Sequence, residues 1–235
     1  MSGKGKCIIF GAGEFPKQLK NTTMNGIPDY EEGDTVIAVD GGLFYCGLLN
    51  MEPDIIIGDF DSLDEELLQA VRVIEENCPE KILRLKPEKD DTDMLVALKW
   101  GLAQGHTLFQ IYGGLGGRLD HSLANIQCLL YLKRQGAEGY LFEEDGMVCV
   151  AMTSDTEDVK QFHPSMEGML SLFSLEAESV VSISHMKYPL SYYRVTNDFP
   201  IGISNEFLPG ESGCIRVHSG AVVLMLKWPG EKQER

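Results

Sequence analysis

The apolar residues of this 235-residue chain change their spacing once, near residue 138, and that change limits the folds open to it. Before this point, short apolar runs alternate with stretches of helical spacing. Fully apolar strands that alternate with amphipathic helices are typical of a parallel sheet covered by helices on both faces. We therefore expect an α/β fold over residues 1–138, with three layers and a mainly parallel sheet. The strands are predicted at 7–10, 35–39, 55–57, 81–85 and 108–112, and the helices at 64–76, 92–103 and about 120–135.

Beyond Gly136 the apolar runs are short and closely spaced, with no helical pattern between them. Turn-forming pairs such as Pro209-Gly210 and Ser219-Gly220 separate these runs. Closely spaced strands without helices favour an antiparallel sandwich or barrel, which we place at residues 139–235. The predicted strands are 140–142, 147–152, 159–163, 169–173, 180–185, 192–195, 214–218 and 221–228.

The composition excludes several kinds of partner. A formal net charge of −16 leaves no basic surface for a nucleic-acid backbone or an anionic membrane. No apolar stretch reaches the length of a membrane-spanning helix, and the N-terminus has no signal-peptide pattern. The six cysteines are scattered without a CxxC pair, which is typical of free thiols in a reducing compartment. We expect a cytoplasmic protein.

Three acidic motifs follow predicted strands or open predicted helices: GDFDSL at 58–63, KDDTD at 89–93 and GGLGGRLDHSLAN at 113–125. In a parallel sheet these positions meet at the carboxyl ends of the strands, the usual place for a ligand crevice. Carboxylates gathered there repel one another unless protons or a hard cation neutralise them. Mg²⁺ that bridges substrate phosphates is the commonest solution. The acids concerned are Asp59, Asp61, Asp90, Asp93 and Asp120.

The two acidic strand-end motifs also have a purely structural interpretation. Asp61-Ser62 could cap the helix predicted at 64–76, since both residue types are favoured N-caps. Asp91 or Thr92 could cap the next helix, and Asp93 in its first turn suits the helix dipole. Capping accounts for one or two acids of KDDTD but leaves a third beside a lysine, which favours a metal and phosphate site.

The glycine run at 113–117 exposes backbone N–H groups that suit an anion, and Arg118 could hold a phosphate through two N–H groups. The alternative is a flexible turn, although such a run is costly in entropy. The lysine-ended pattern of ordinary P-loops is absent. Gly11-Ala12-Gly13 lacks the third glycine of a dinucleotide fingerprint, because Pro16 takes its place, and a tight turn is favoured. Asp40, with two glycines after it, is a better site candidate.

Five segments, taken together and in this order, resemble the thiamin pyrophosphokinase family. They are AVDGG at 38–42, IIGDFDSL at 56–63, KDDTD at 89–93, GGLGGRLDH at 113–121 and GISNEF at 202–207. The resemblance implies an α/β domain followed by a β-sandwich that binds thiamine. It also implies a homodimer that transfers the pyrophosphoryl group of ATP to the hydroxyethyl group of thiamine. The products would be thiamine pyrophosphate and AMP.

The same resemblance assigns roles to residues of this chain. Asp59, Asp61 and Asp93 would hold Mg²⁺. ATP would be bound by Asp40, Lys89, Thr92, Gly114, Gly117 and Arg118. The catalytic set would be Asp120, which could orient or deprotonate the hydroxyl, together with Arg118 and Asp90. Thiamine would lie between two subunits and contact Tyr188, Ser204 and Asn205, with Tyr188 stacked on its cationic ring.

Three other functions remain open at this point. A pyrophosphokinase for a hydroxymethyl substrate such as a pterin could share the N-terminal motifs, although it would need a different second domain. An aspartyl phosphatase would use Asp59 as a covalent nucleophile, but Leu63 does not fit that motif and the glycine run would have no role. A non-catalytic sensor of thiamine or a nucleotide would keep the sites without turnover.

Overall fold

The computed structural model describes residues 4–15, 30–86, 90–153 and 157–229. Its contacts divide the chain into two compact units. We call them the α/β unit, Met1–Cys128 with Gln135–Glu144, and the β unit, Leu129–Arg134 with Asp145–Arg235. The α/β fold followed by an antiparallel region, as predicted, is confirmed by the sheets described below.

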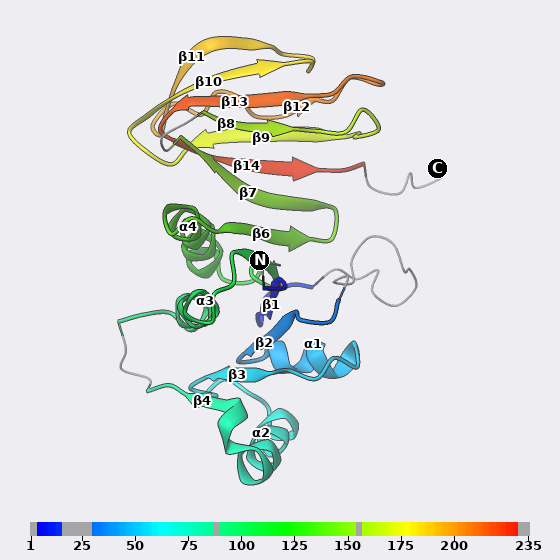
Figure 1. The fold of residues 1–235 in the computed structure, drawn as a ribbon, viewed down its shortest axis with the longest axis vertical. Helices are drawn as coiled ribbons and strands as arrows, with labels where there is room; N and C mark the ends of the chain where they lie inside the picture. The colour runs from blue at the N-terminus through cyan, green and yellow to red at the C-terminus, as the bar shows by residue number, and fades with distance from the viewer. Residues whose placement is uncertain (1–3, 16–29, 87–89, 154–156, 230–235) are drawn as a thin grey trace. The chain divides into compact units, whose positions relative to one another are not determined.

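The sheet of the α/β unit has six parallel strands in the order β6-β5-β1-β2-β3-β4 (Figure 1). Because β2 lies on one side of β1 and β5 on the other, the direction of winding reverses at β1. Open α/β sheets bind ligands at the carboxyl ends of strands beside such a switch point. The strands are β1 (Cys7–Phe10), β2 (Thr35–Val39), β3 (Ile55–Gly58), β4 (Ile82–Arg84), β5 (Leu108–Tyr112) and β6 (Glu138–Glu143).

Among the described residues, α1 and α2 cover one face of this sheet and α3 and α4 cover the other (Figure 1). Two of them begin at side-chain caps: Asp64 accepts from Leu67 N at 2.9 Å, and Thr92 accepts from Leu95 N at 3.2 Å. No helix in the described ranges is long and apolar enough to cross a membrane. The bounds are α1 (Gly42–Leu48), α2 (Glu65–Asn77), α3 (Asp93–Ala103) and α4 (Leu119–Arg134), with a 3-10 turn η2 (Pro79–Lys81) before β4.

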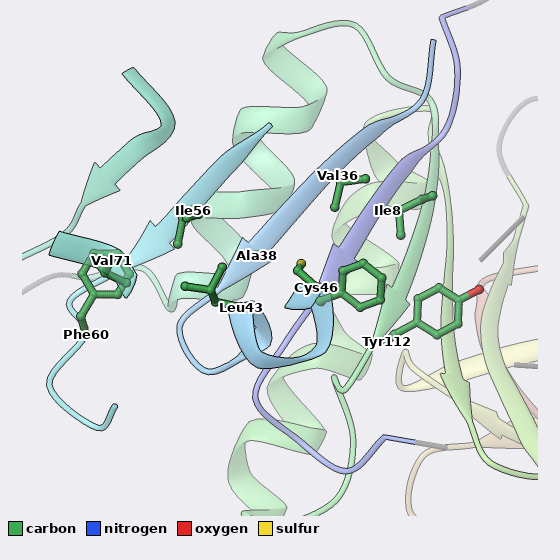
Figure 2. Packing of buried hydrophobic residues seen from close by; sticks show 10 residues of the cluster. Ile8, Val36, Ala38, Leu43, Cys46, Ile56, Phe60, Val71 and Tyr112 are labelled. Atoms are coloured by element: carbon green, nitrogen blue, oxygen red, sulfur yellow. The ribbon is translucent and has the colours of Figure 1, made fainter. Parts of the chain in front are cut away.

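The core beneath α1 and α2 shows why these segments pack together (Figure 2). Side chains from the apolar strands β1, β2 and β3 meet apolar side chains of α1 and α2, and burial of each large one contributes about 1.5–3 kcal/mol. The buried members of this cluster are Ile8, Phe10, Val36, Ala38, Leu43, Cys46, Ile56, Phe60, Val71 and Tyr112.

The β unit contains two antiparallel sheets, in the orders β12-β9-β14-β7 and β11-β10-β13-β8. Buried and exposed residues alternate along β9, β10 and β13, so each sheet turns one apolar face inward, as in a sandwich. The strands are β7 (Gly146–Met152), β8 (Asp158–Gln161), β9 (Met169–Ser174), β10 (Glu178–Ser184), β11 (Leu190–Thr196), β12 (Asn205–Glu206), β13 (Cys214–Ser219) and β14 (Ala221–Lys227).

Three features differ from the sequence-based expectation. The run at 140–142, placed in the second domain, belongs to β6, which pairs in parallel with β5 and so lies in the α/β unit. The contacts assign Gln135–Glu144 to the α/β unit and Leu129–Arg134 to the β unit, so the division does not fall at a single point after residue 138. Neither α1 nor β12 was expected from the sequence. At seven residues, and without a side-chain cap, α1 is too short for its periodicity to be read.

Candidate active site

A cavity of about 560 Å³ lies in the α/β unit at the carboxyl ends of β1, β2, β3 and β5. Turns after four different strands, and the first turns of α3 and α4, form its wall, which places it at the switch point of the sheet. The lining includes Gly11, Gly13, Asp40, Ser62, Thr92, Asp93, Gly113, Gly114, Gly117, Arg118, Asp120 and Asn125.

Two glycine turns are joined by backbone hydrogen bonds along one wall of this cavity. Gly13 N donates to Gly113 O at 2.7 Å, and Glu14 N donates to Leu115 O at 2.9 Å. A Cβ at Gly13 would overlap with Leu115 O, so the two turns can approach this closely only because a side chain is absent. The chain bends at Ala12 and Gly13 directly after β1, and the predicted tight turn into a helix stays a prediction because residues 16–29 lie outside the described residues. Gly11, Ala12 and Gly13 also line the cavity, a role that the sequence did not reveal.

A buried side chain holds the glycine loop against α4. Asn125 is only 8% exposed, and its Nδ2 donates to Gly114 O at 2.6 Å. This contact fixes the loop whose N–H groups we expect to meet an anion. Asn125 ends the motif at 113–125, but sequence reasoning assigned it no role. The sequence does carry a signal for this role: an amide side chain stands at the end of a glycine-rich motif, within the helical pattern that forms α4.

Asp40 has a strained backbone at the end of β2. Its φ of 46° lies in the left-handed region, which costs a non-glycine residue about 1–3 kcal/mol. The conformation is held because Asp40 N donates to Ile57 O at 3.0 Å and Asp40 Oδ1 accepts from Phe60 N at 3.4 Å. A Cβ at Gly58 would overlap with Asp40 Oδ1. The glycine of GDFDSL therefore makes room for a carboxylate from the neighbouring strand.

The acids of GDFDSL lie on either side of a buried aromatic residue. Phe60 is 2% exposed and packs in the core, with the Arg84 guanidinium 4.9 Å from its ring centroid. Asp59 Oδ1 accepts from Asp61 N at 3.3 Å. Since Asp64 caps α2, the interpretation of Asp61-Ser62 as the helix cap is wrong. Ser62 lines the cavity, whereas Asp59 and Asp61 lie outside the described lining.

The KDDTD motif divides its side chains between the cavity and the surface. Thr92 and Asp93 line the cavity, and Thr92 caps α3 as the structural interpretation proposed. Asp91 instead pairs with Lys99 at 2.6 Å. Asp90 lies outside the described lining, and Lys89 falls outside the described residues.

Arg118 and Asp120 form a two-point ion pair at the mouth of the cavity. Arg118 Nε donates to Asp120 Oδ1 at 3.1 Å, and Arg118 Nη2 donates to Asp120 Oδ2 at 2.6 Å. This contact, with a further bond from His121 N, lowers the pKa of Asp120 to about 2. The two N–H groups that would hold a phosphate thus hold a carboxylate in this structure.

The three residues predicted to bind thiamine lie near one another in the β unit. Asn205 is 3% exposed; its Oδ1 accepts from Tyr188 N at 2.9 Å and its Nδ2 donates to Tyr188 O at 2.8 Å. Tyr188 is 55% exposed, with Lys187 Nζ 5.5 Å from its ring centroid. Ser204, at a φ of 55°, donates its N–H to Ser171 Oγ at 3.1 Å. The Asn205 amide therefore positions the backbone of Tyr188.

Comparisons with known proteins identify the family. Residues 30–141 match the family model described as thiamin pyrophosphokinase, catalytic domain, and residues 157–222 match its vitamin B1 binding domain. A thiamine pyrophosphokinase of Bacillus subtilis is 31% identical over 191 residues, which cover 78% of this chain and 85% of the relative. The chain belongs to the thiamin pyrophosphokinase family.

Solved structures of the thiamin pyrophosphokinase family share the fold. The B. subtilis enzyme gives a TM-score of 0.77 at 26% identity, covering 97% of this chain and 100% of the other. The yeast enzyme gives a TM-score of 0.72 at 14% identity, covering 97% and 87%. Membership of this family makes the chain an enzyme of the ATP-dependent pyrophosphotransferase kind.

The donor atoms of the cavity fit the magnesium ion predicted from the sequence. Asp40 and Asp93 both line it, and Mg²⁺ is usually held by one or two carboxylates together with substrate phosphates. Within the described ranges, no group of three or more His, Cys, Asp or Glu side chains is placed to hold a metal ion. The assignment of Asp59, Asp61 and Asp93 to the metal stays a prediction.

Proposed function

We propose that the α/β cavity binds ATP with Mg²⁺ and transfers its pyrophosphoryl group to the hydroxyethyl oxygen of thiamine. The products are thiamine pyrophosphate and AMP. The observation that carries this proposal is the convergence of a glycine loop, Arg118 and two carboxylates on one cavity in a member of this family. The match of residues 157–222 to a vitamin B1 binding domain favours thiamine over a pterin as the acceptor.

The triphosphate lies along the glycine loop in this proposal. The N–H groups of Gly114 and Gly117 bind phosphate oxygens, and the N-terminus of α4, which begins at Leu119, adds its positive end. Asn125 keeps the loop in place through Gly114 O. Arg118 neutralises charge on the transferred group, and Thr92 and Lys89 complete the ATP site.

The carboxylates at the strand ends serve the metal. Asp93 and Asp40, which both line the cavity, would hold Mg²⁺ together with phosphate oxygens. Asp61, which directly precedes the lining residue Ser62, and Asp59 are the further ligands predicted from the sequence and would join the ion when it is bound. When bound, Mg²⁺ offsets charge on the phosphate oxygens. Asp90, which is close to Asp93 in the sequence, adds negative charge to the electrostatic field at the metal site.

Asp120 is the proposed acceptor of the thiamine hydroxyl proton. The hydroxyl oxygen attacks the β-phosphorus, the bond to the AMP oxygen breaks, and the proton passes to a carboxylate late in the step. With a pKa of about 2 while paired with Arg118, Asp120 is a weak base. A phosphate that takes Arg118 removes this hydrogen bond, so the pKa of Asp120 rises when ATP is bound.

Thiamine is held by the β unit in this proposal, between two copies of the chain. The exposed ring of Tyr188 faces the cationic ring of thiamine, a contact worth about 0.5–2 kcal/mol, and Asn205 fixes the segment that carries Tyr188. Ser204 adds a polar contact. All six cysteines, which lie within the described residues, are free thiols, in keeping with the proposed cytoplasmic location.

The test is a mass-resolved product assay with ATP, Mg²⁺ and thiamine, with and without EDTA. We expect AMP and thiamine pyrophosphate in equal amounts, and neither with EDTA. Formation of ADP with thiamine monophosphate would contradict the proposed pyrophosphoryl transfer. Thiamine binding without any product would support the alternative of a non-catalytic thiamine sensor. Within one motif, Asp93→Asn should abolish product formation, whereas Asp91→Asn, which alters only the surface pair with Lys99, should retain it.

A further inference from the structure

Three side chains on the outer face of the β11-β10-β13-β8 sheet form a continuous chain of hydrogen bonds. Ser182 Oγ lies 2.8 Å from His218 Nε2, and His218 Nδ1 lies 2.6 Å from Glu157 Oε1. Arg216 Nη1 donates to the second oxygen, Glu157 Oε2, at 2.7 Å. These residues all belong to the β unit, and none has a role in the proposed kinase reaction.

The direction of each hydrogen bond follows from the chemistry of the groups. The hydrogen bonds from Arg216 and then His218 lower the pKa of Glu157, so it is an ionised carboxylate that can only accept. His218 Nδ1–H therefore donates to Glu157, and in the neutral imidazole Nε2 is the acceptor. Tyr192 N donates to Ser182 Oγ at 3.0 Å, and the hydroxyl proton of Ser182 then points to His218 Nε2. This is the order of a serine nucleophile, its general base and the group that orients the base.

The backbone around Ser182 is distorted. Val181 pairs with Tyr193 and Ile183 with Leu190, so two residues of β11, Ser191 and Tyr192, face the single residue Ser182. Such a bulge redirects side chains and is common next to active sites. Tyr192 has a φ of 47°, a strained value for a large side chain, and its ring stacks on His218 with centroids 4.0 Å apart. Tyr192, which has this strained φ, is also the residue whose N–H donates to Ser182.

A hollow of about 660 Å³ lies beside this chain on the same face of the sheet. Its lining includes Arg216, which is directly opposite Ser182 in the ladder, and Ser184, two residues further along β10. Side chains opposite one another in an antiparallel pair have Cβ atoms about 4.5–5.5 Å apart. A small molecule in the hollow can therefore bring a carbonyl group to the half-buried Ser182, with the guanidinium of Arg216 near its oxygen.

We propose that Ser182 is a nucleophile activated by His218 and Glu157, and that this face is a second reactive site, for carboxylic esters. Ser182 Oγ attacks the ester carbonyl while its proton moves to His218 Nε2, and the alcohol leaves with that proton. Water then attacks the acyl carbon, His218 takes a proton from it, and Ser182 leaves as the free hydroxyl. The overall change is one ester plus one water to one acid plus one alcohol.

Two probes of the full-length protein test this proposal: turnover of p-nitrophenyl acetate, and labelling by a fluorophosphonate read by intact mass and peptide mapping. We expect one adduct, on Ser182, and none in Ser182→Ala. Ser165→Ala is the matched control, because Ser165 Oγ also lies within hydrogen-bond distance of a histidine, His163 Nδ1 at 2.7 Å, but is outside the hollow, and it should be labelled as fast as the wild type. His218→Gln should slow labelling by about 100-fold or more, the share of a general base.

Retained kinase activity of Ser182→Ala shows that the variant is folded. The proposal is overturned if the adduct is absent from the wild type or lies on another residue. It is equally overturned if His218→Gln is labelled at the wild-type rate, since the hydrogen-bonded chain would then be only structural.

Discussion

The two units of this protein place their polar side chains by different means. In the α/β unit all six strands run parallel, so the turns after β1, β2, β3 and β5 meet at one edge and form the cavity from backbone and short side chains. In the β unit, Ser182, Arg216 and His218 come from the middle of antiparallel strands and meet through register. Strand ends thus combine distant motifs, whereas a sheet face combines residues that happen to be opposite one another.

This difference has a consequence for tolerance to substitution. The α/β cavity depends on closely packed turns, where one added carbon atom overlaps with a neighbour. The outer face of the β unit depends on side chains that point away from its core, so single changes there should alter chemistry and spare stability. Three predictions probe the α/β cavity and a fourth compares one ion pair in each unit, ordered from the largest expected effect to the smallest.

Removal of the Arg118 side chain should have the largest effect. Arg118→Ala removes the donors that we propose bind the transferred group, and we expect kcat/KM to fall by about 100-fold or more. Arg118→Lys keeps the charge but not the two-point contact and should recover only part of this loss. Arg72→Ala, which breaks a surface pair with Glu65 on α2, is the control and should leave steady-state kinetics unchanged. Equal values of kcat/KM for Arg118→Ala and Arg72→Ala would contradict the assignment of Arg118 to the ATP site.

Gly58 tests how tightly the turns are packed. In Gly58→Ala the new Cβ displaces the Asp40 carboxylate, and misplacement of a site group by about 1 Å can cost up to about 100-fold in rate. At Gly47, in α1, an added Cβ would have no neighbouring atom within 4 Å, so Gly47→Ala should stabilise the protein by about 0.5–1 kcal/mol. Kinetics and thermal unfolding of both variants give the comparison. A fully active Gly58→Ala would show that Asp40 is not needed where it lies.

Substitutions of Asn125 test whether the glycine loop needs the hydrogen bond from Asn125 Nδ2 to Gly114 O. Asn125→Leu and Asn125→Asp both lose the amide donor to Gly114 O, and we expect the KM for ATP to rise by about 10-fold, near 1.4 kcal/mol. The aspartate variant should improve relative to wild type as the pH falls, because a protonated carboxyl can donate to Gly114 O again. The leucine variant should not improve. Parallel pH profiles for the two variants would mean that Asn125 only fills space.

The two units can be compared by how the free energy of unfolding changes at acid pH, because each unit contains a poorly exposed ion pair. Asp34 pairs with Lys6 at 2.8 Å, and Asp158 pairs with Lys133 at 2.8 Å. Burial alone would raise the pKa of both acids, but hydrogen bonds from the lysines and from backbone N–H groups hold each below its ordinary value. Each pair therefore stabilises the fold above the unfolded pKa of about 3.9 and loses its effect as the pH falls through the folded value.

Asp34→Asn and Asp158→Asn should each lower the free energy of unfolding at neutral pH by about 1–3 kcal/mol and make it less dependent on pH below about 5. The effect should be larger for Asp34, whose side chain is 3% exposed against 16% for Asp158. Chemical unfolding at several pH values measures both. An unchanged slope of stability against pH would show that these pairs do not set the acid sensitivity.

The sequence by itself determined the elements with a strong local signal. Strands such as Cys7–Phe10 and Thr35–Val39 coincide with the predicted runs because nearly uniform burial demands nearly uniform apolar character. It also identified Asp40, Asp93, Arg118 and Asp120, since acids and an arginine at strand ends are costly unless they serve a ligand. Their convergence on one cavity follows from the parallel direction of the strands.

Only the tertiary structure decided which strands and side chains become partners. The run at 140–142 carries the same apolar signal for a parallel or an antiparallel neighbour, so its pairing with β5 could not be read from it. The clamp between Asn125 and Gly114 depends on how α4 packs. Ser182, His218 and Glu157, far apart in the chain, meet because register and a bulge bring them together. The type of a residue limits the chemistry open to it, and long-range packing determines which other residues it contacts.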